Sequence, residues 1–335
     1  MRIAFFEIRE WEKKYLRKKL RSHTLDFFAG PLDNGSVPKG KDAEILSVFI
    51  YSKVNAAVLR AMSRLKLVAT RSTGFDHIDM QECRRRSITV ATVPFYGENT
   101  VAEHTFALIL ALSRNIHKAY VKSLRYDFSI EGLKGFDLKG RTLGVVGAGG
   151  IGLNVIRIAK GFAMDVLVYD THPNKVISEA LGFCYGSFEE VLGRSDIITL
   201  HVPYNKNTHH LINKGNIHAI KKGAILINTA RGSVVETEAL LEALDKKILA
   251  GAGLDVLEGE ELIKEEKQLL YDTGKLESLG KIVKDHILLS RDNVVFTPHI
   301  AFYSQEALER ILETTVHNIL AFLAGTPQNV IRGEG

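Results

Sequence analysis

The chain has 335 residues, enough for two domains that each bury a core of their own. Apolar residues make up 45% and charged residues 25%, as in an ordinary soluble protein. The net charge of +5 is small, and the densest basic run, Arg84-Arg85-Arg86, has no aromatic residues between its arginines, which argues against nucleic-acid binding.

The cysteines and the N-terminal residues indicate the cellular compartment of the protein. Cys83 and Cys184 lie far apart and have no metal-type spacing, which favours a reducing compartment and no metal site. The chain starts directly with a strand-like run at residues 3–6, unlike a signal peptide, and no apolar run is long enough to span a membrane. We therefore expect a cytoplasmic protein that binds neither nucleic acid nor membrane.

Residues 1 to about 95 alternate between strand-like and helix-like patterns. The expected strands are residues 3–6, 45–50, 67–70 and 88–92, and the expected helices are residues 10–20, 55–62 and 78–86. This alternation predicts a parallel sheet with helices on its faces. Because parallel sheets bind ligands at the carboxyl ends of their strands, the backbone N–H groups of Thr73 and Gly74 are candidates to hold a substrate carboxylate. An ordinary turn explains this stretch equally well.

A break follows at residues 93–99, where proline and glycine flank two aromatic residues. From Thr100 to Arg125 the apolar residues recur at three- and four-residue steps, which predicts one long helix at the start of a second domain. Glu103 and His104 lie inside this helix, and we expect them to form a surface or interface ion pair without a catalytic role.

A glycine-rich turn opens the second domain. Residues 143–146 form a short apolar run typical of a buried parallel strand, and residues 153–162 have helical spacing. Between them stands the pattern G-x-G-x-x-G, made by Gly147, Gly149 and Gly152 with Gly150 and Ile151 inside it. The glycines allow a tight turn, close approach of a pyrophosphate and close packing of the helix on the strand. The order strand, glycines, helix predicts a dinucleotide site.

The next strand, residues 165–169, ends at Asp170. A carboxylate there can accept hydrogen bonds from both ribose hydroxyls and repels a 2′-phosphate, which favours NAD over NADP. His172 and Lys175 weaken that preference somewhat.

Further strands are expected at residues 196–200, 224–228, 250–254 and 294–296, giving six strands and a doubly wound Rossmann sheet. Four motifs follow these strands: His201-Val202-Pro203, Thr229-Ala230-Arg231-Gly232, a carboxylate-rich run from Asp255 to Glu260, and Thr297-Pro298-His299. An arginine, carboxylates and a histidine at one sheet edge suit hydride transfer to a 2-oxo acid. The histidine supplies a proton, a carboxylate supports the imidazolium, and the guanidinium binds a carboxylate in two places.

Taken together, these motifs resemble the D-isomer-specific 2-hydroxyacid dehydrogenase family over nearly the whole chain. Residues 255–260, 297–303 and 93–96 look most like its D-lactate dehydrogenase branch. The resemblance implies that Arg231, Glu260 and His299 are catalytic, with Glu260 supporting His299 as the acid and base. It also implies that Asp255 bonds the nicotinamide carboxamide or supports the site.

Other roles follow from the same resemblance. Cofactor contacts are implied for Gly147, Gly149, Gly150, Ile151, Gly152, Asp170, Val202, Pro203, Thr208, Thr229 and Ala230. Substrate contacts are implied for Thr73, Gly74, Tyr96, Arg231 and Tyr303. The chain departs from the commoner pattern at Glu261, where the family has proline, so Glu260 rests on spacing among several nearby glutamates. Residues 261–293 have helical spacing, and we expect a small helical insertion that packs against the sheet.

These observations predict an α/β protein of two domains. A Rossmann NAD-binding domain at residues 98–302 is inserted into a smaller flavodoxin-like substrate domain made of residues 1–97 and 303–335. The expected function is NAD-dependent interconversion of pyruvate and D-lactate. Alternatives are a D-hydroxyisocaproate or phenyllactate type of dehydrogenase, with Phe95, Tyr96, Phe302 and Tyr303 around a larger side chain, and an NAD-sensing corepressor-like binding protein. The resemblance implies a homodimer that pairs through residues 100–125.

Overall fold

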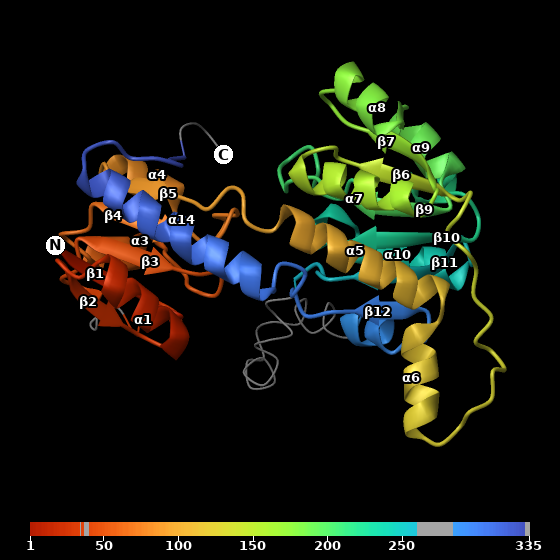
Figure 1. Cartoon of the computed structure of the whole chain (residues 1–335), viewed down its shortest axis with the longest axis horizontal. Coiled ribbons are helices and arrows are strands. Elements are labelled where there is room, and N and C mark those ends of the chain that lie inside the picture. The colour runs from red at the N-terminus through yellow and green to blue at the C-terminus, as the bar shows by residue number, and fades with distance from the viewer. Residues whose placement is uncertain (34, 37–39, 260–283, 332–335) are drawn as a thin grey trace. The chain divides into compact units, whose positions relative to one another are not determined.

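A computed structural model describes residues 1–33, 35–36, 40–259 and 284–331. The chain divides into two compact units (Figure 1). Unit 1 comprises Met1–Tyr96 and Ser304–Gly335, and unit 2 comprises Gly97–Tyr303. Each unit contains its own parallel sheet, covered by helices on both faces.

Within the described residues, the sheet of unit 1 has five strands in the order β2-β1-β3-β4-β5, all parallel. The strands are β1 (Arg2–Phe5), β2 (Thr24–Phe27), β3 (Ile45–Val48), β4 (Leu67–Thr70) and β5 (Thr89–Ala91). This is the flavodoxin-like strand order, as predicted. The edge strand β2 was missed, because it lies half-exposed and carries no continuous apolar run.

The two faces of the unit 1 sheet carry different helices. Helices α1 (Glu10–Lys19) and α14 (Gln305–Leu323) cover one face, and Figure 1 shows α14 running beside α1 across the strands. Helices α3 (Ala56–Ala61) and α4 (Met80–Arg85) cover the other. The last long helix of the chain thus supplies core residues to the first strands of the sequence.

Unit 2 contains a sheet of seven parallel strands within the described residues, ordered β12-β11-β10-β9-β6-β7-β8. The strands are β6 (Thr142–Val146), β7 (Asp165–Tyr169), β8 (Cys184–Tyr185), β9 (Ile197–Leu200), β10 (Ala224–Asn228), β11 (Leu249–Leu254) and β12 (Val294–Phe296). Counted from β6, this is the Rossmann order 3-2-1-4-5-6 with one more strand at the end. The prediction of six strands missed β8, which has only two residues.

Both faces of this sheet are buried, which explains the continuous apolar runs of its strands. In β10, Ile225 and Ile227 pack toward α5 (Glu98–Ser113) and α7 (Gly150–Gly161). Leu226 packs toward the opposite face. The elements of that face are α9 (Phe188–Arg194), α10 (Thr237–Asp245) and the 3-10 turns η1 (Ile217–Ala219) and η2 (Gly232–Val234), while α8 (Lys175–Leu181) precedes β8.

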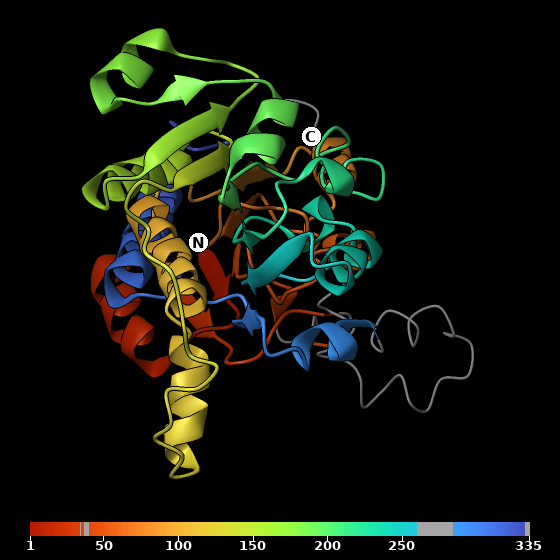
Figure 2. The same cartoon turned by 90° about the vertical axis from the view of Figure 1, so that its right-hand side faces the viewer.

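The predicted single helix from Thr100 to Arg125 is wrong, because two helices occupy this stretch. Helix α5 ends at Ser113 and α6 (Ile116–Leu124) begins after Asn115, whose φ of 50° is left-handed. Asparagine tolerates this conformation, and the apolar spacing continues across the break, so the pattern conceals it. In Figures 1 and 2, α6 and the segment after it, coloured yellow, project away from the sheet of unit 2.

The expectations for the helical insertion and for membrane-spanning segments can be compared only with the described residues. Of the expected helical insertion at residues 261–293, residues 284–289 are helical and residues 290–293 are not, and residues 261–283 lie outside the described part of the chain. Over the described ranges, no helix combines the length and apolar character needed to cross a bilayer.

Candidate active site

The site is built at one edge of the unit 2 sheet. Because all its strands run parallel, the loops that follow β6, β7, β9, β10, β11 and β12 emerge at the same edge. These loops and the start of α7 carry the unit 2 residues that the sequence assigned to catalysis or to the cofactor, except Glu260, which lies outside the described residues.

The loop between β6 and α7 has the geometry of a pyrophosphate-binding turn. Gly147 has φ +96°, and a Cβ placed on Gly152 would lie 2.0 Å from the carbonyl oxygen of Gly147. A Cβ placed on Gly149 would meet no atom within 4 Å, so space is open where a phosphate would approach. Gly149 is the N-cap of α7 and makes no side-chain hydrogen bond to the first turn of the helix. The N-terminus of α7 is therefore suited to bind an anion. Ile151, in the first turn of α7, packs on the core.

Asp170 stands beside this loop at the end of β7. Its Oδ2 accepts the N–H of Ala148 at 2.7 Å, and its Oδ1 accepts the N–H of His172 at 2.8 Å. A carboxylate has about four acceptor positions, so two backbone contacts leave room for two ribose hydroxyls. The placement fits the role expected for this residue.

The loop after β9 closes against the glycine turn. The N–H of His201 donates to the carbonyl of Val146 at 2.8 Å, and the hydroxyl of Thr208 donates to the carbonyl of Pro203 at 2.6 Å. Burial lowers the pKa of His201 to about 3, so its imidazole is neutral at physiological pH. Val202 lies beside Gly147, near where the adenosine side of the cofactor is expected.

Asn228, at the end of β10, shapes the loop that carries Arg231. Its Oδ1 accepts the N–H of Ala230 at 3.0 Å, and its Nδ2 donates to the carbonyl of Arg231 at 2.9 Å. The Arg231 guanidinium donates to the carbonyl of Ala230 at 2.8 Å, and Thr229 pairs with the hydroxyl of Thr105 at 3.0 Å. No role was expected for Asn228 from the sequence, although an asparagine that ends a buried strand is typical of such side-chain turns.

The Arg231 loop touches the loop after β11 through the backbone. A Cβ placed on Gly232 would lie 2.0 Å from the carbonyl oxygen of Leu257. In addition, the N–H of Asp255 donates to the carbonyl of Asn228 at 2.9 Å. Any residue other than glycine at 232 would force these two loops apart.

Asp255 in turn holds the loop after β12. Its side chain is 1% exposed and accepts three hydrogen bonds, from the Thr297 hydroxyl at 2.5 Å and from the N–H groups of Ile300 and Ala301 at 2.9 Å each. The N–H of His299 donates to the Asp255 carbonyl at 2.9 Å. Arg231 and His299 therefore stand on two loops that both bond to Asp255.

His299 has φ 55° and an aromatic neighbour. Its ring centroid lies 6.3 Å from that of Phe302, edge to face, and Phe302 lies 5.8 Å from Tyr303 in the same manner. Phe302 and Tyr303 thus place aromatic surface beside the expected acid and base.

The contacts of His104 differ from those expected from the sequence. Rather than forming a surface pair, its Nε2 lies 2.9 Å from the Thr297 hydroxyl and 3.5 Å from Asp255 Oδ1. Burial lowers the pKa of His104, while the charge of Asp255 acts in the opposite direction.

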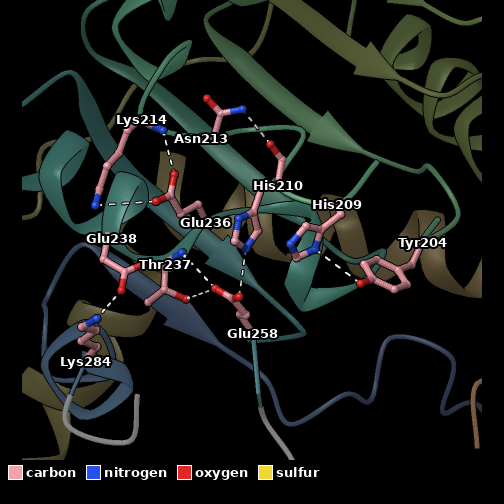
Figure 3. Close-up of polar contacts among 10 residues, drawn as sticks. All are labelled: Tyr204, His209, His210, Asn213, Lys214, Glu236, Thr237, Glu238, Glu258 and Lys284. Atoms are coloured by element: carbon pink, nitrogen blue, oxygen red, sulfur yellow. Dashed lines mark hydrogen bonds and ion pairs between the residues drawn. The ribbon is translucent and has the colours of Figure 1, made fainter. Parts of the chain in front are cut away.

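Figure 3 shows the polar contacts around Glu258, the first glutamate after β11. One carboxylate oxygen lies 2.9 Å from Nε2 of His210, and the other accepts the Thr237 hydroxyl at 3.2 Å. Beside it, Lys214 N–H donates to Glu236 at 2.8 Å, and Nδ1 of His209 lies 3.4 Å from the Tyr204 hydroxyl. Glu258 is therefore engaged with its own unit, whereas Glu260 lies outside the described residues.

Of the expected substrate residues of unit 1, Thr73 and Gly74 lie in a hydrogen-bonded loop after β4, and Tyr96 lies in the segment after β5. The Thr73 hydroxyl donates to the Val93 carbonyl at 2.7 Å, and the Ser72 hydroxyl donates to the Gly74 carbonyl at 2.6 Å. The carbonyl of Tyr96 accepts Nε of Arg310 at 2.7 Å. These contacts order the loop and leave Thr73 exposed.

Among the described residues, no group of three or more histidine, cysteine or carboxylate side chains is arranged to hold a metal ion. The chemistry of the unit 2 edge is that of an arginine, a histidine and a buried aspartate beside a dinucleotide turn.

Comparisons with known proteins agree with this geometry. The sequence profile of the "D-isomer specific 2-hydroxyacid dehydrogenase, NAD binding domain" matches residues 106–301, more than half of the chain. The chain is 32% identical to the D-lactate dehydrogenase of Escherichia coli K12 over 326 residues, covering 95% of this chain and 96% of that one. The chain belongs to the D-isomer-specific 2-hydroxyacid dehydrogenase family.

The similarity to solved dehydrogenase structures extends over nearly the whole chain. D-lactate dehydrogenase from Aquifex aeolicus, solved with NAD and lactic acid, has a TM-score of 0.86 and 37% identity, covering 99% of this chain and 100% of that one. A D-2-hydroxyisocaproate dehydrogenase structure has a TM-score of 0.84 and 30% identity, with the same coverage. This dehydrogenase is accordingly an NAD-dependent oxidoreductase that acts on the CH–OH group of D-2-hydroxy acids.

Proposed function

We propose that this dehydrogenase interconverts pyruvate and D-lactate. The observation that carries the proposal is the placement of Arg231 and His299 on two loops that both bond to the buried Asp255, at the edge that also holds the glycine turn. The likeness to D-lactate dehydrogenases supports the choice of substrate.

The reaction consumes pyruvate, NADH and a proton and yields D-lactate and NAD⁺. When bound, the nicotinamide supplies or accepts the hydride at the carbonyl carbon. Arg231 binds the substrate carboxylate through both guanidinium arms and polarises the carbonyl. His299 delivers its proton to the carbonyl oxygen in reduction and removes it in oxidation.

Glu260 is the proposed partner of His299. A carboxylate beside an imidazole raises the histidine pKa and keeps the ring oriented. Support comes from the spacing of Glu260 after β11 and from Glu258, whose carboxylate bonds His210 and Thr237 instead. Thr73, Gly74 and Tyr96 of unit 1 stay proposed substrate ligands on the strength of the family resemblance.

The main alternative function is a dehydrogenase for a larger 2-oxo acid than pyruvate. Phe302 and Tyr303 present large apolar surface next to His299, and such surface also suits a branched or aromatic 2-oxo acid. The structural likeness to a D-2-hydroxyisocaproate dehydrogenase supports this alternative.

The deciding experiment is a panel of 2-oxo acids, namely pyruvate, 2-oxoisocaproate, phenylpyruvate and glyoxylate, assayed by NADH oxidation. Chiral chromatography of each product determines its hand. We expect the highest kcat/KM with pyruvate and a D product. A higher kcat/KM with 2-oxoisocaproate or phenylpyruvate would assign the alternative, and NADH binding without oxidation of any substrate would favour a corepressor-like protein.

We propose further that the enzyme is a homodimer paired through α6 and the segment after it. The large apolar side chains exposed there are Ile116, Tyr120, Val121, Leu124, Tyr126, Phe128 and Ile130. So many exposed apolar side chains on one short segment are typical of an interface.

Light scattering after size exclusion tests the pairing. We expect a dimer for the native chain and a monomer for the double variant L124E/F128E. A control is V176E, which adds one such charge at an exposed apolar position on α8. A double variant that stays dimeric would refute the assignment of the surface.

The two cysteines are both free thiols, which suits the reducing cytoplasm that we propose as the location.

A further inference from the structure

A partly buried chain of hydrogen bonds connects α5 to the turn that carries His299. Its members are His104, Thr297 and Asp255, joined at 2.9 Å from His104 Nε2 to Thr297 Oγ1 and at 2.5 Å from Thr297 Oγ1 to Asp255 Oδ1. Asp255 is 1% exposed, and the side chain of His104 is 20% exposed. The three residues come from three separate parts of unit 2, namely α5, the loop after β12 and the loop after β11.

The donors and acceptors of this chain can be assigned. The Asp255 carboxylate only accepts hydrogen bonds, so the single hydroxyl hydrogen of Thr297 points to it. Thr297 can then only accept from His104, which means that Nε2 of His104 carries a hydrogen. Nε2 of His104 also lies 3.5 Å from Asp255 Oδ1, so the hydrogen that it donates to Thr297 is close to the buried charge as well.

The other groups that donate hydrogen bonds to Asp255 belong to the His299 turn. Its carboxylate accepts the N–H groups of Ile300 and Ala301, and its carbonyl accepts the N–H of His299. His299 itself has a left-handed φ of 55°, a conformation that a histidine keeps only when its surroundings hold it. An interaction that stabilises the Asp255 carboxylate therefore also stabilises the turn that carries His299.

We propose that His104 is a positioning residue for His299, acting through Thr297 and Asp255. The inference rests on the proposed function only in taking His299 as the acid and base. His104 supplies the Nε2–H that orients the Thr297 hydroxyl and helps to stabilise the buried carboxylate. It is not a catalytic residue, because its contacts are with Thr297 and Asp255 rather than with the reacting atoms.

The test compares three variants with the native enzyme. In H104L the donor is gone, whereas in H104Q the amide Nε2 can replace the imidazole Nε2 as a donor. The matched control is E103Q, which changes the neighbouring exposed residue on α5. We expect H104L to lower kcat for pyruvate by about tenfold, equivalent to about 1.4 kcal/mol, while the Kd for NADH and the KM for pyruvate change less than twofold. H104Q should recover most of the lost kcat, and E103Q should behave as the native enzyme.

Two outcomes of these assays would overturn the inference. One is a native kcat in H104L. The other is an equal loss in H104L and H104Q, since a donor at Nε2 would then not be the feature that matters.

A second variant covers the case in which H104L folds poorly. T297V removes the hydroxyl and keeps the shape of the side chain. We expect T297V to lower kcat by a similar factor, and the double variant H104L/T297V to lose little more than either single variant, because the residues act as one chain. Fully additive losses would contradict the proposal.

A readout without substrate separates this inference from the proposed function. The imidazole NMR signals of His299, assigned by their absence in H299Q, should move in H104L and T297V and stay near native in H104Q and E103Q. Signals that do not move in H104L would overturn the positioning role. A native enzyme that oxidises NADH with none of the 2-oxo acids would refute the proposed function alone, since the NMR comparison still decides the role of His104.

Discussion

The open space beside Gly149 leads to a substitution that separates cofactor binding from folding. A Cβ placed on Gly149 would meet no atom within 4 Å, and its φ of −73° suits alanine. G149A should therefore fold normally. Because the second glycine of the turn is where the pyrophosphate comes closest, the new methyl group should occupy space that the cofactor needs.

The expected effect on stability is close to zero, as two small terms oppose one another. Replacing glycine by alanine removes unfolded-state freedom, which stabilises by about 0.4–1 kcal/mol. Alanine is a poorer N-cap than glycine, and Gly149 is the N-cap of α7, which costs a similar amount, roughly 0.5–1 kcal/mol. We expect the Tm to stay within about 3 °C of native. For NADH we expect Kd to rise at least about tenfold, or about 1.4 kcal/mol.

Two further glycines of the same helix provide the controls. Gly161 lies at the far end of α7 and also has open space around it, so G161A should keep both Tm and NADH affinity. In G152A the new Cβ would lie 2.0 Å from the Gly147 carbonyl oxygen, so the backbone must shift and Tm should fall clearly. Calorimetry and NADH fluorescence titration measure both quantities. A G149A protein with native Tm and native NADH affinity would refute the assignment of this turn to the pyrophosphate.

Four other predictions address single residues. D170A should admit NADPH, because the carboxylate that repels a 2′-phosphate is gone; an undiminished preference for NADH in kcat/KM would count against the ribose assignment. R231K should raise KM for pyruvate and lower kcat, together about 10–100-fold in kcat/KM, since a point charge replaces a two-armed contact; unchanged kinetics would exclude that contact. H299Q should lower kcat by at least about 100-fold, and near-native turnover would remove His299 from proton transfer. Burial raises the pKa of the Cys83 thiol to about 11, so Ellman's reagent at pH 8 should modify the exposed Cys184 quickly and Cys83 only after unfolding; two fast thiols in the native protein would contradict this burial.

The sheets could be predicted from the sequence where strands are buried on both faces. β6 and β10 read as continuous apolar runs because helices cover them above and below. The edge strands β2 and β8 lack this signal, since β2 is half-exposed and β8 has two residues. Asn115 ends α5 through its own backbone conformation, which a three- and four-residue apolar pattern does not register.

For the site, too, the sequence predicted the residues that have a local signal and missed a contact between distant residues. Arg231, Asp255 and His299 could be placed because each follows a parallel strand, and such strands end at one edge. The role of His104 could not be predicted, since its partner Thr297 is 193 residues away in the chain. A histidine on a helix has no local feature that distinguishes an inward hydrogen bond from a surface pair.

The buried carboxylate of Asp255 couples the two loops that carry Arg231 and His299. Removing a carboxylate from water costs several kcal/mol, and hydrogen bonds to a charged group return about 1.5–3 kcal/mol each. The Thr297 hydroxyl and the N–H groups of Ile300 and Ala301 are the direct donors, all from the loop that carries His299. Because these donors reach Asp255 only when that loop is closed, the buried charge makes one loop conformation far more stable than the others. The same aspartate bonds the end of β10 through its own N–H, so the conformations of the arginine loop and the histidine loop are coupled through one side chain and its backbone.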